Sequence, residues 1–373
     1  MKAAALKATA DSKTDDEKAT ALVAYVQQHV RDVNDDSVSE AERTAVLSKL
    51  PKDRRRNAVE VFKGGIGVGE ELNSVFAAMA STLGLDARPA YVANKTNVFF
   101  DPASMPDTYF LRFVDIAVKI GDGWKIYDPA SKLVSPGMVT SGEEGMTALI
   151  SDPKKPTFLI VPYSAPSASK EARTATLRLN AEGTLEGDVV ETYTGHRARE
   201  YRLELDGNSS GRQEELLKDR LKNMFPDSEV TAIAFENITN TTLPLKVSYH
   251  LHAPLYAQGA GRRMFFPVFP FQRAETSPFS AAERRHPIMF PYAWEESDDL
   301  SIQLPPGTAL DSADSPGAFD FLPAGKLSVD LAIRSDGVLT VKRQFLIGDK
   351  GNLFFDAKNY KRVQTSLLRG SET

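Results

Sequence analysis

Residues 67–84 read GVGEELNSVFAAMASTLG and predict the helix around which the rest of the chain is organised. Apolar side chains recur in this stretch at helical spacing and form one stripe that must be buried: Leu72, Val75, Phe76, Met79 and Leu83. Glu70 and Glu71 favour the first turn, because negative charge stabilises the positive end of a helix dipole. Gly84 is placed to close the helix in a left-handed conformation. We therefore expect a core helix with a glycine-lined start.

The sequence that leaves this helix matches a pattern found in a known family. Residues 83–92 read LGLDARPAYV. This exit resembles that of the nucleophile helix in bacterial transglutaminase-like proteins, which belong to the papain-like cysteine protease superfamily. Family members carry a Gly-x-Cys-x-Asp motif at the start of the helix. Counting back from the exit puts Gly69 at the position of the nucleophilic cysteine and Glu71 at the acidic position that follows.

The other two positions of the family's catalytic triad lie on a predicted hairpin. Residues 110–120 and 124–127 read as strands, and the sequence Gly-Asp-Gly between them favours a tight turn. The resemblance places Phe113 at the histidine position. It places Asp128, which stands in a Tyr-Asp-Pro sequence, at the aspartate position.

The resemblance implies acyl transfer or peptide hydrolysis through a cysteine thioester, with histidine as the base and aspartate as its orienter. This chain contains no cysteine, and none of its five histidines lies between residues 30 and 195. Of the three triad positions, only Asp128 carries the family's residue. We therefore predict a transglutaminase-like domain that has lost catalysis.

The order of the predicted elements divides the chain into three domains and a linker. Several helices followed by strands predict an α+β domain over residues 1–150. Residues 151–170 are rich in proline and small polar residues, which is typical of a linker. Alternating strands predict a β-rich domain with inserted helices over 171–284 and a small antiparallel β-sandwich over 285–373. The resemblance implies a similar pair of β modules after the catalytic-type domain.

Composition and charge argue against several classes of function. The 373-residue chain has a net charge of −5 and no long basic run, so we expect no nucleic acid partner. No apolar run approaches the roughly 18 residues of a membrane span. His250 and His252 share a face of a predicted strand, but two ligands without a third are weak evidence for a metal site. We expect neither a metal nor a cofactor.

A binding or scaffold function is the first hypothesis for a domain with a vacated triad. Backbone N–H groups at the glycine-lined helix start could hold a carboxylate of a peptide or of a cell-wall fragment, although Glu70 and Glu71 already place negative charge there. The expected binding residues lie in the cleft left by the triad: Gly67, Gly69, Glu71 and Asp128. The resemblance implies an exported protein, periplasmic or extracellular, of which this chain is the later part.

An enzyme that uses different groups is the alternative hypothesis. Carboxylates such as Asp128 and Glu71 could act as an acid–base pair and hydrolyse a peptide, an amide or a glycan. Asp115 is a further candidate, because strand alternation puts it on the same face as Phe113.

Overall fold

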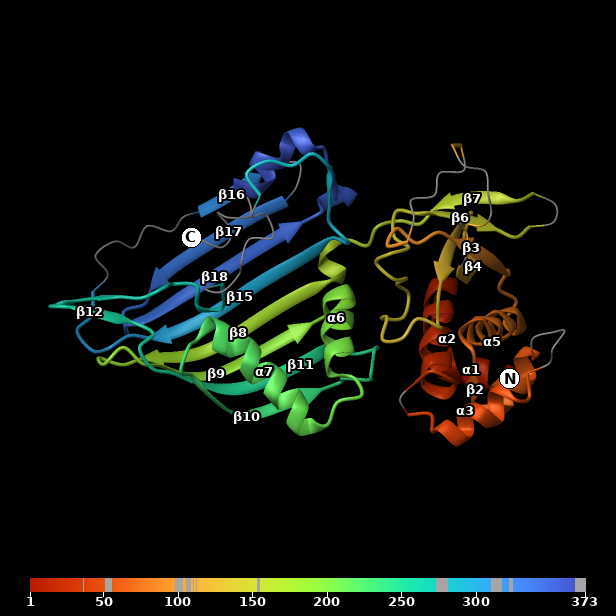
Figure 1. The fold of residues 1–373 in the computed structure, drawn as a ribbon, viewed down its shortest axis with the longest axis horizontal. Coiled ribbons are helices and arrows are strands. Elements are labelled where there is room, and N and C mark those ends of the chain that lie inside the picture. The colour runs from red at the N-terminus through yellow and green to blue at the C-terminus, as the bar shows by residue number, and fades with distance from the viewer. Residues whose placement is uncertain are drawn as a thin grey trace. The chain divides into compact units, whose positions relative to one another are not determined.

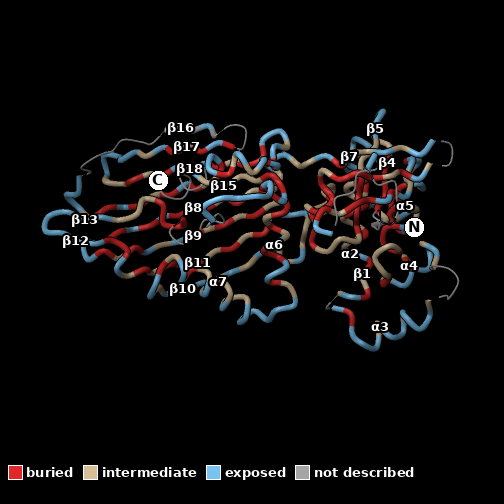
Figure 2. The backbone as a smooth tube through the Cα atoms, turned by 45° about the horizontal axis from the view of Figure 1, so that its top comes forward, coloured by how far each residue is buried: buried red, intermediate tan, exposed pale blue. Residues whose placement is uncertain are grey.

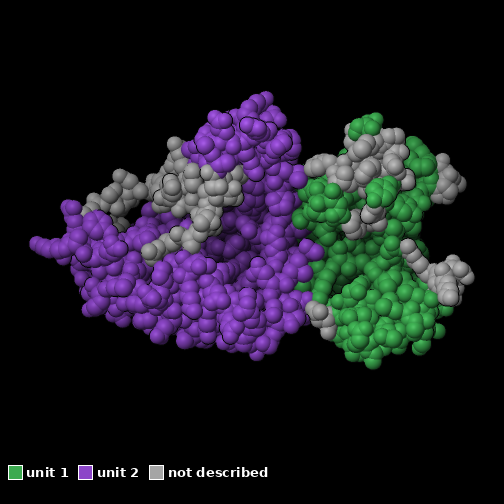
Figure 3. All heavy atoms as spheres, viewed as in Figure 1, with its two compact units in different colours: residues 1–163 green, residues 164–373 purple. Residues whose placement is uncertain are grey.

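The computed structural model describes residues 1–365 except 36, 51–55, 98–102, 105–108, 110, 112, 153–154, 273–280, 310–316 and 322–324. The chain forms two compact units, residues 1–163 and residues 164–373 (Figure 3). Both units combine helices with β-sheet, so the predicted α+β class is confirmed. The boundary between the units falls inside the segment that the sequence predicts as a linker.

The first unit combines helices with a five-stranded antiparallel sheet (Figure 1). Its described helices are α1 (Lys2–Ala8), α2 (Asp15–His29), α3 (Glu40–Leu47), α4 (Ala58–Gly64) and α5 (Gly69–Thr82). The sheet has the order β5-β4-β3-β6-β7, with strands β3 (Ala87–Val92), β4 (Phe113–Ile120), β5 (Gly123–Tyr127), β6 (Thr147–Ile150) and β7 (Thr157–Ile160). A short parallel pair, β1 (Arg31–Asp32) with β2 (Ile66–Gly67), leads into α5.

The predicted core helix is α5, and its apolar stripe is buried. The side chains on this stripe pack with residues of α2, with residues of β4 and with Tyr127; those at most 3% exposed are Leu72, Val75, Phe76 and Met79. Burying one such side chain contributes about 1.5–3 kcal/mol. Gly84 has a φ of +83°, as the predicted left-handed cap requires. Packing against α2 and against the strands β4 and β5 therefore holds the helix in place.

An eight-stranded sheet forms the body of the second unit, in the order β10-β11-β9-β8-β15-β18-β17-β16. The strands are β8 (Lys170–Leu179), β9 (Leu185–Tyr193), β10 (Glu229–Glu236), β11 (Leu245–Ala253), β15 (Trp294–Gln303), β16 (Gly317–Phe321), β17 (Gly325–Ile333) and β18 (Val338–Ile347). The helices α6 (Gly195–Leu205) and α7 (Ser210–Met224) lie against one face of it (Figure 1). Two short antiparallel pairs are β12 (Gln258–Ala260) with β13 (Arg263–Phe265), and β14 (Ile288–Met289) with β19 (Phe354–Phe355).

The segments predicted as two β-rich domains, 171–284 and 285–373, share this one sheet and do not form separate sandwiches. β8 of the first segment pairs in parallel with β15 of the second, with Ala175 opposite Leu300. Strand alternation reveals which face of a strand is buried, but it does not reveal which strand lies beside it. The predicted linker, 151–170, likewise contains β7, which pairs with β6 in the first unit.

Charged side chains are buried on the sheet of the second unit, where Figure 2 shows buried residues along β8, β9 and β11. Arg173 of β8 lies 3.0 Å from Asp298 of β15, and Arg343 of β18 lies 3.1 Å from Glu296 of β15. The network consists of carboxylates and guanidinium groups that neutralise one another: Glu171, Glu191, Glu296, Asp298, Arg173, Arg197, Arg220 and Arg343. These ion pairs join strands from both predicted β-rich domains.

Replacing Glu191 with glutamine should destabilise the second unit strongly. Glu191 is 1% exposed and accepts hydrogen bonds from Tyr193 (2.6 Å), Tyr249 (2.9 Å) and Arg220 (2.5 Å). The amide would leave the guanidinium of Arg220 without its counter-charge, so we expect urea denaturation to show a loss of about 3 kcal/mol in the free energy of unfolding.

The matched control is Glu236→Gln, which removes an exposed ion pair with Lys246 (2.8 Å). This variant should lose less than about 1 kcal/mol, because solvent screens exposed pairs. Equal losses in the two variants would contradict a supporting role for the buried network.

Candidate functional site

Glu71 closes the start of α5 and is already paired. Its Oε2 accepts the N–H of Val68 at 3.1 Å and Nη2 of Arg56 at 2.5 Å, and its Oε1 accepts Nε of Arg56 at 3.1 Å. Burial would raise the pKa of Glu71, but the hydrogen bonds and charge of Arg56 and the N–H of Val68 outweigh it and lower the pKa below its usual range. Glu71 is therefore an ionised cap of the helix, held by a neighbouring arginine.

The two glycines at this helix start differ in the space around them. Gly67 is buried in β2, where a Cβ atom would lie 2.8 Å from Val61 Cγ1 and 3.0 Å from Leu72 Cδ1. Gly69 is the first residue of α5, and a Cβ atom there would lie 3.5 Å from the Cβ of Ala130 and 3.7 Å from Oδ2 of Asp32. The structure thus places Gly69 beside the segment that follows Asp128, with room for a side chain.

Asp128 follows β5 and is surrounded by hydrogen-bond donors. Its Oδ1 accepts from Nδ2 of Asn73 at 2.9 Å and from the N–H of Ala130 at 3.1 Å, and its Oδ2 accepts from the hydroxyl of Ser131. Asn73 also accepts the N–H of Ala130 at 3.0 Å and donates to the carbonyl of Val114 at 2.9 Å. Asp128 therefore joins the end of β5 to the first turns of α5.

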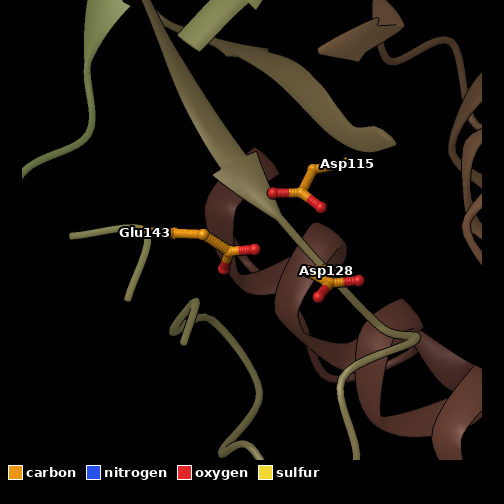
Figure 4. Close-up of side chains that lie close together, drawn as sticks. All are labelled: Asp115, Asp128 and Glu143. Atoms are coloured by element: carbon orange, nitrogen blue, oxygen red, sulfur yellow. The ribbon is translucent and has the colours of Figure 1, made fainter. Parts of the chain in front are cut away.

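A cluster of three carboxylates lies at the same place (Figure 4). Phe113 is the first residue of β4 and lies opposite Val92. Ile116 of β4 lies opposite Tyr127 of β5 in an antiparallel pair, so the residue before Ile116, Asp115, comes next to the residue after Tyr127, Asp128. Glu143 reaches the two aspartates from the loop before β6, and one oxygen of each carboxylate lies within 4.8 Å of the others. We call Asp115, Asp128 and Glu143 the carboxylate cluster.

The three residues of the carboxylate cluster are buried, and the surroundings of Asp115 stabilise its negative charge the least. Asp115 is 2% exposed, and no group in the described part of the chain hydrogen-bonds to its Oδ2. Burial, and after it the negative charges of Asp128 and Glu143, raise the pKa of Asp115 well above its usual range. Glu143, in contrast, accepts from the N–H (2.9 Å) and the hydroxyl (2.8 Å) of Thr140. Hard divalent cations prefer carboxylate oxygens as ligands.

Sequence reasoning identified Asp128 and Asp115 as candidates but missed Asn73 and Glu143. An asparagine in the interior of an apolar helix is a weak signal, because asparagine is a poor helix former that usually hydrogen-bonds elsewhere. The sequence feature that concerns Glu143 is Thr140, three residues before it, and this spacing indicates a local hydrogen bond and not a functional site. Glu71, which the sequence paired with Asp128 as an acid–base couple, is bonded to Arg56 and is not a member of the carboxylate cluster.

The two histidines noted in the sequence lie on β11, and their nearest charged partners are on β9. Nδ1 of His250 lies 2.8 Å from Asp188, and the carboxylate of Glu186 is 3.4 Å from His250 and 3.9 Å from His252. The hydrogen bond with Asp188 is the main reason that the pKa of His250 is raised. These contacts form an exposed ion-pair group on the sheet.

A protein family matches part of the sequence of this chain, and a solved structure resembles its fold. Residues 262–365 match a family described as a domain of unknown function with a solved structure, DUF3858. The fold of the chain is similar to that of a protein from Parabacteroides distasonis whose crystal structure is described as that of a "putative protease", with a TM-score of 0.51 and 10% sequence identity. No curated protein matches this chain.

The structural match covers 100% of this chain and 53% of the other, so this chain spans about half the length of that protein. At 10% identity the likeness shows a shared fold and carries no activity with it. Among the described helices, none combines the length and the apolar character that crossing a membrane requires.

Alanine at the two glycines should have opposite effects. Gly67→Ala forces a methyl group against Val61 and Leu72, so we expect a loss of about 1–3 kcal/mol in the free energy of unfolding. Gly69→Ala meets ordinary contact distances and improves helix propensity, so it should be neutral or stabilising by up to about 1 kcal/mol. Thermal and urea unfolding of both variants measure this difference. A destabilised Gly69→Ala would show that the room beside Ala130 is not available.

Glu71→Gln should lower stability at neutral pH and not in acid. Because the pKa of Glu71 is lowered in the folded state, its ionised form contributes stability above the ordinary glutamate pKa, and this contribution disappears as the pH falls through the folded-state value. Urea unfolding of the wild type and the variant between pH 7 and pH 2 should therefore converge at the acid end. A difference that is the same at every pH would exclude the ion pair with Arg56 as its cause.

Proposed function

We propose that this chain is a non-catalytic module of the bacterial cell envelope, which binds a peptide or protein segment or serves as a scaffold for its β-rich unit. We further propose that the first unit is a transglutaminase-like domain that has lost its thiol chemistry. The observation that carries the proposal is Gly69 at the first position of α5, beside the segment after Asp128. Loss of the nucleophile from a comparable triad enzyme costs about a million-fold in rate.

The hydrogen bonds of Asp128 support the loss of the triad. In a working triad the aspartate accepts a hydrogen bond from the histidine and holds the ring in place. Here the amide of Asn73, the N–H of Ala130 and the hydroxyl of Ser131 donate to Asp128. These donors give the carboxylate a structural task between α5 and β5.

The charges around the helix start favour a basic or neutral ligand over an anionic one. Asp32 lies 3.7 Å from the position that a side chain at residue 69 would begin to fill, and Glu70 stands in the first turn. Glu71, in the same turn, is already neutralised by Arg56. The N–H of Val68 is already bonded to Glu71. We therefore propose a lysine- or arginine-containing peptide segment as the ligand, in place of the carboxylate that the sequence alone suggested.

The envelope location rests on the resemblance to transglutaminase-like proteins, because multi-domain proteins of that kind are commonly exported. Fractionation of cells that produce the full-length protein tests it directly. Recovery in the periplasm or outside the cell supports the proposal, and recovery with the cytosol contradicts it.

A carboxylate-dependent hydrolase is the second candidate function. Burial and the neighbouring carboxylates raise the pKa of Asp115, which lies beside Asp128, and a pair of neighbouring carboxyl groups in unlike environments is the pattern of an acid–base pair. Their burial, with Asp115 2% and Asp128 6% exposed, argues against access by a substrate. The binding function is therefore the one that the geometry supports best.

The proposed function predicts binding without turnover. We expect the wild-type protein to release no product from peptide, amide and glycan substrates, and to bind a lysine-rich peptide in preference to a glutamate-rich peptide of the same length. Fluorescence anisotropy at increasing salt should show weaker binding of the basic peptide, because salt screens charge attraction. Asp32→Asn should lower the affinity several-fold.

The matched control for Asp32→Asn is Glu236→Gln in the second unit, which removes the same charge on β10 and should leave the affinity unchanged. Equal binding of basic and acidic peptides would contradict the ligand class. A hydrolytic activity that Asp115→Asn abolishes would replace the proposed function with the hydrolase.

A further inference from the structure

The carboxylate cluster has the spacing of ligands around one cation. One oxygen each from Asp115, Asp128 and Glu143 lies within 4.8 Å of the others. Figure 4 shows the three carboxyl groups turned toward one another from β4, from the end of β5 and from the loop before β6. Hard divalent cations hold carboxylate oxygens at about 2.0–2.6 Å, so two oxygens on one ion are at most about 5 Å apart.

Two of these carboxylates are oriented by donors that leave them able to bind an ion. Oδ1 of Asp128 accepts from Asn73 and Ala130, and Oε2 of Glu143 accepts from the N–H and the hydroxyl of Thr140. A carboxylate has about four lone-pair sites, and the donors to Asp128 are Asn73, Ala130 and Ser131, so its carboxylate can still bind an ion. Carboxylates that bind metals are typically held by a second layer of hydrogen bonds of this kind.

Asp115 supplies the observation that points to a ligand. It is 2% exposed, its Oδ2 has no hydrogen-bond partner among the residues that the structure describes, and its carboxyl group is aimed at the other two. The strongest charges acting on it are those of Asp128 and Glu143, both negative. A buried carboxylate in this position is unfavourable unless a positive charge or a proton neutralises it.

We propose that Asp115, Asp128 and Glu143 bind a divalent cation that prefers oxygen ligands, of the class of Mg²⁺, Ca²⁺ and Mn²⁺. The ligand set contains neither histidine nor cysteine, so ions that prefer nitrogen or sulfur are disfavoured. The proposal departs from the sequence-based expectation of no metal and goes beyond the proposed function, because a binding module and a scaffold could each use such an ion. The ion would fasten β4, the end of β5 and the loop before β6 to one another.

The experiment uses the full chain, treated with a chelator that is then removed by exchange into metal-free buffer. Mg²⁺, Ca²⁺ and Mn²⁺ are each titrated into it by calorimetry, and the melting temperature is recorded at each concentration. We expect saturable binding of at least one of these ions to one site per chain, with a melting temperature that rises with its concentration. Asp115→Asn removes the negative charge of one ligand and should weaken that binding at least about ten-fold.

Asp115→Asn is expected to fold, because the change is nearly isosteric and removes repulsion between buried carboxylates. Thr140→Val, which deletes the hydroxyl donor to Glu143, should weaken the affinity about 10–100-fold without removing a ligand. Asp122→Asn in the exposed hairpin turn is the matched control and should bind as the wild type does. The proposal is overturned if none of the three ions binds saturably, or if Asp115→Asn binds as tightly as the wild type. A melting temperature that changes with pH but with none of the three cations would also overturn the proposal, because it would show that protons, and not a cation, neutralise the carboxylate cluster.

Discussion

The side-chain amide of Asn73 fixes the part of the molecule on which the candidate site depends. Its nitrogen donates to the carbonyl of Val114 and to Asp128, and its oxygen accepts the N–H of Ala130. These groups are buried or half-buried, so breaking the arrangement would leave polar atoms unpaired at a cost of about 1–3 kcal/mol each. The helix α5, the strand β4 and the end of β5 therefore keep one relative placement, and Gly69, Asp115 and Asp128 are carried on these same elements.

This arrangement gives Asp128 a structural role that needs no histidine partner. Asp128 is bonded to donors that belong to the fold, so its carboxylate has a use when no histidine is present. The same bonds hold it close to Asp115, which lacks donors of its own at Oδ2. Asp128 is thus suited to hold a proton or a cation together with a second carboxylate, Asp115.

The sequence predicted the features that depend on neighbouring residues and missed those that depend on distant ones. The apolar stripe of α5, the left-handed Gly84 and the hairpin between β4 and β5 follow from local patterns, and the structure contains them. The ion pair between Glu71 and Arg56 joins two residues 15 positions apart, and no local sequence pattern indicates it. The sequence therefore predicts Glu71 as a ligand-binding residue, although its carboxylate is already paired. Glu143 reaches Asp115 through a loop contact that no periodicity encodes.

Asp115 and the buried carboxylates of the second unit are held under opposite conditions, and the contrast explains why one group is structural and the other a candidate site. In the second unit, each buried carboxylate of the network lies against an arginine, as Asp298 does with Arg173 and Glu296 with Arg343. These pairs cancel charge within the chain and connect strands whose sequences alone suggested separate domains. In the first unit, the strongest charges on Asp115 are negative. Burial disfavours the charged form in both places, so Asp115 requires a neutralising partner, and a cation from solution would also satisfy the spacing of its two neighbours.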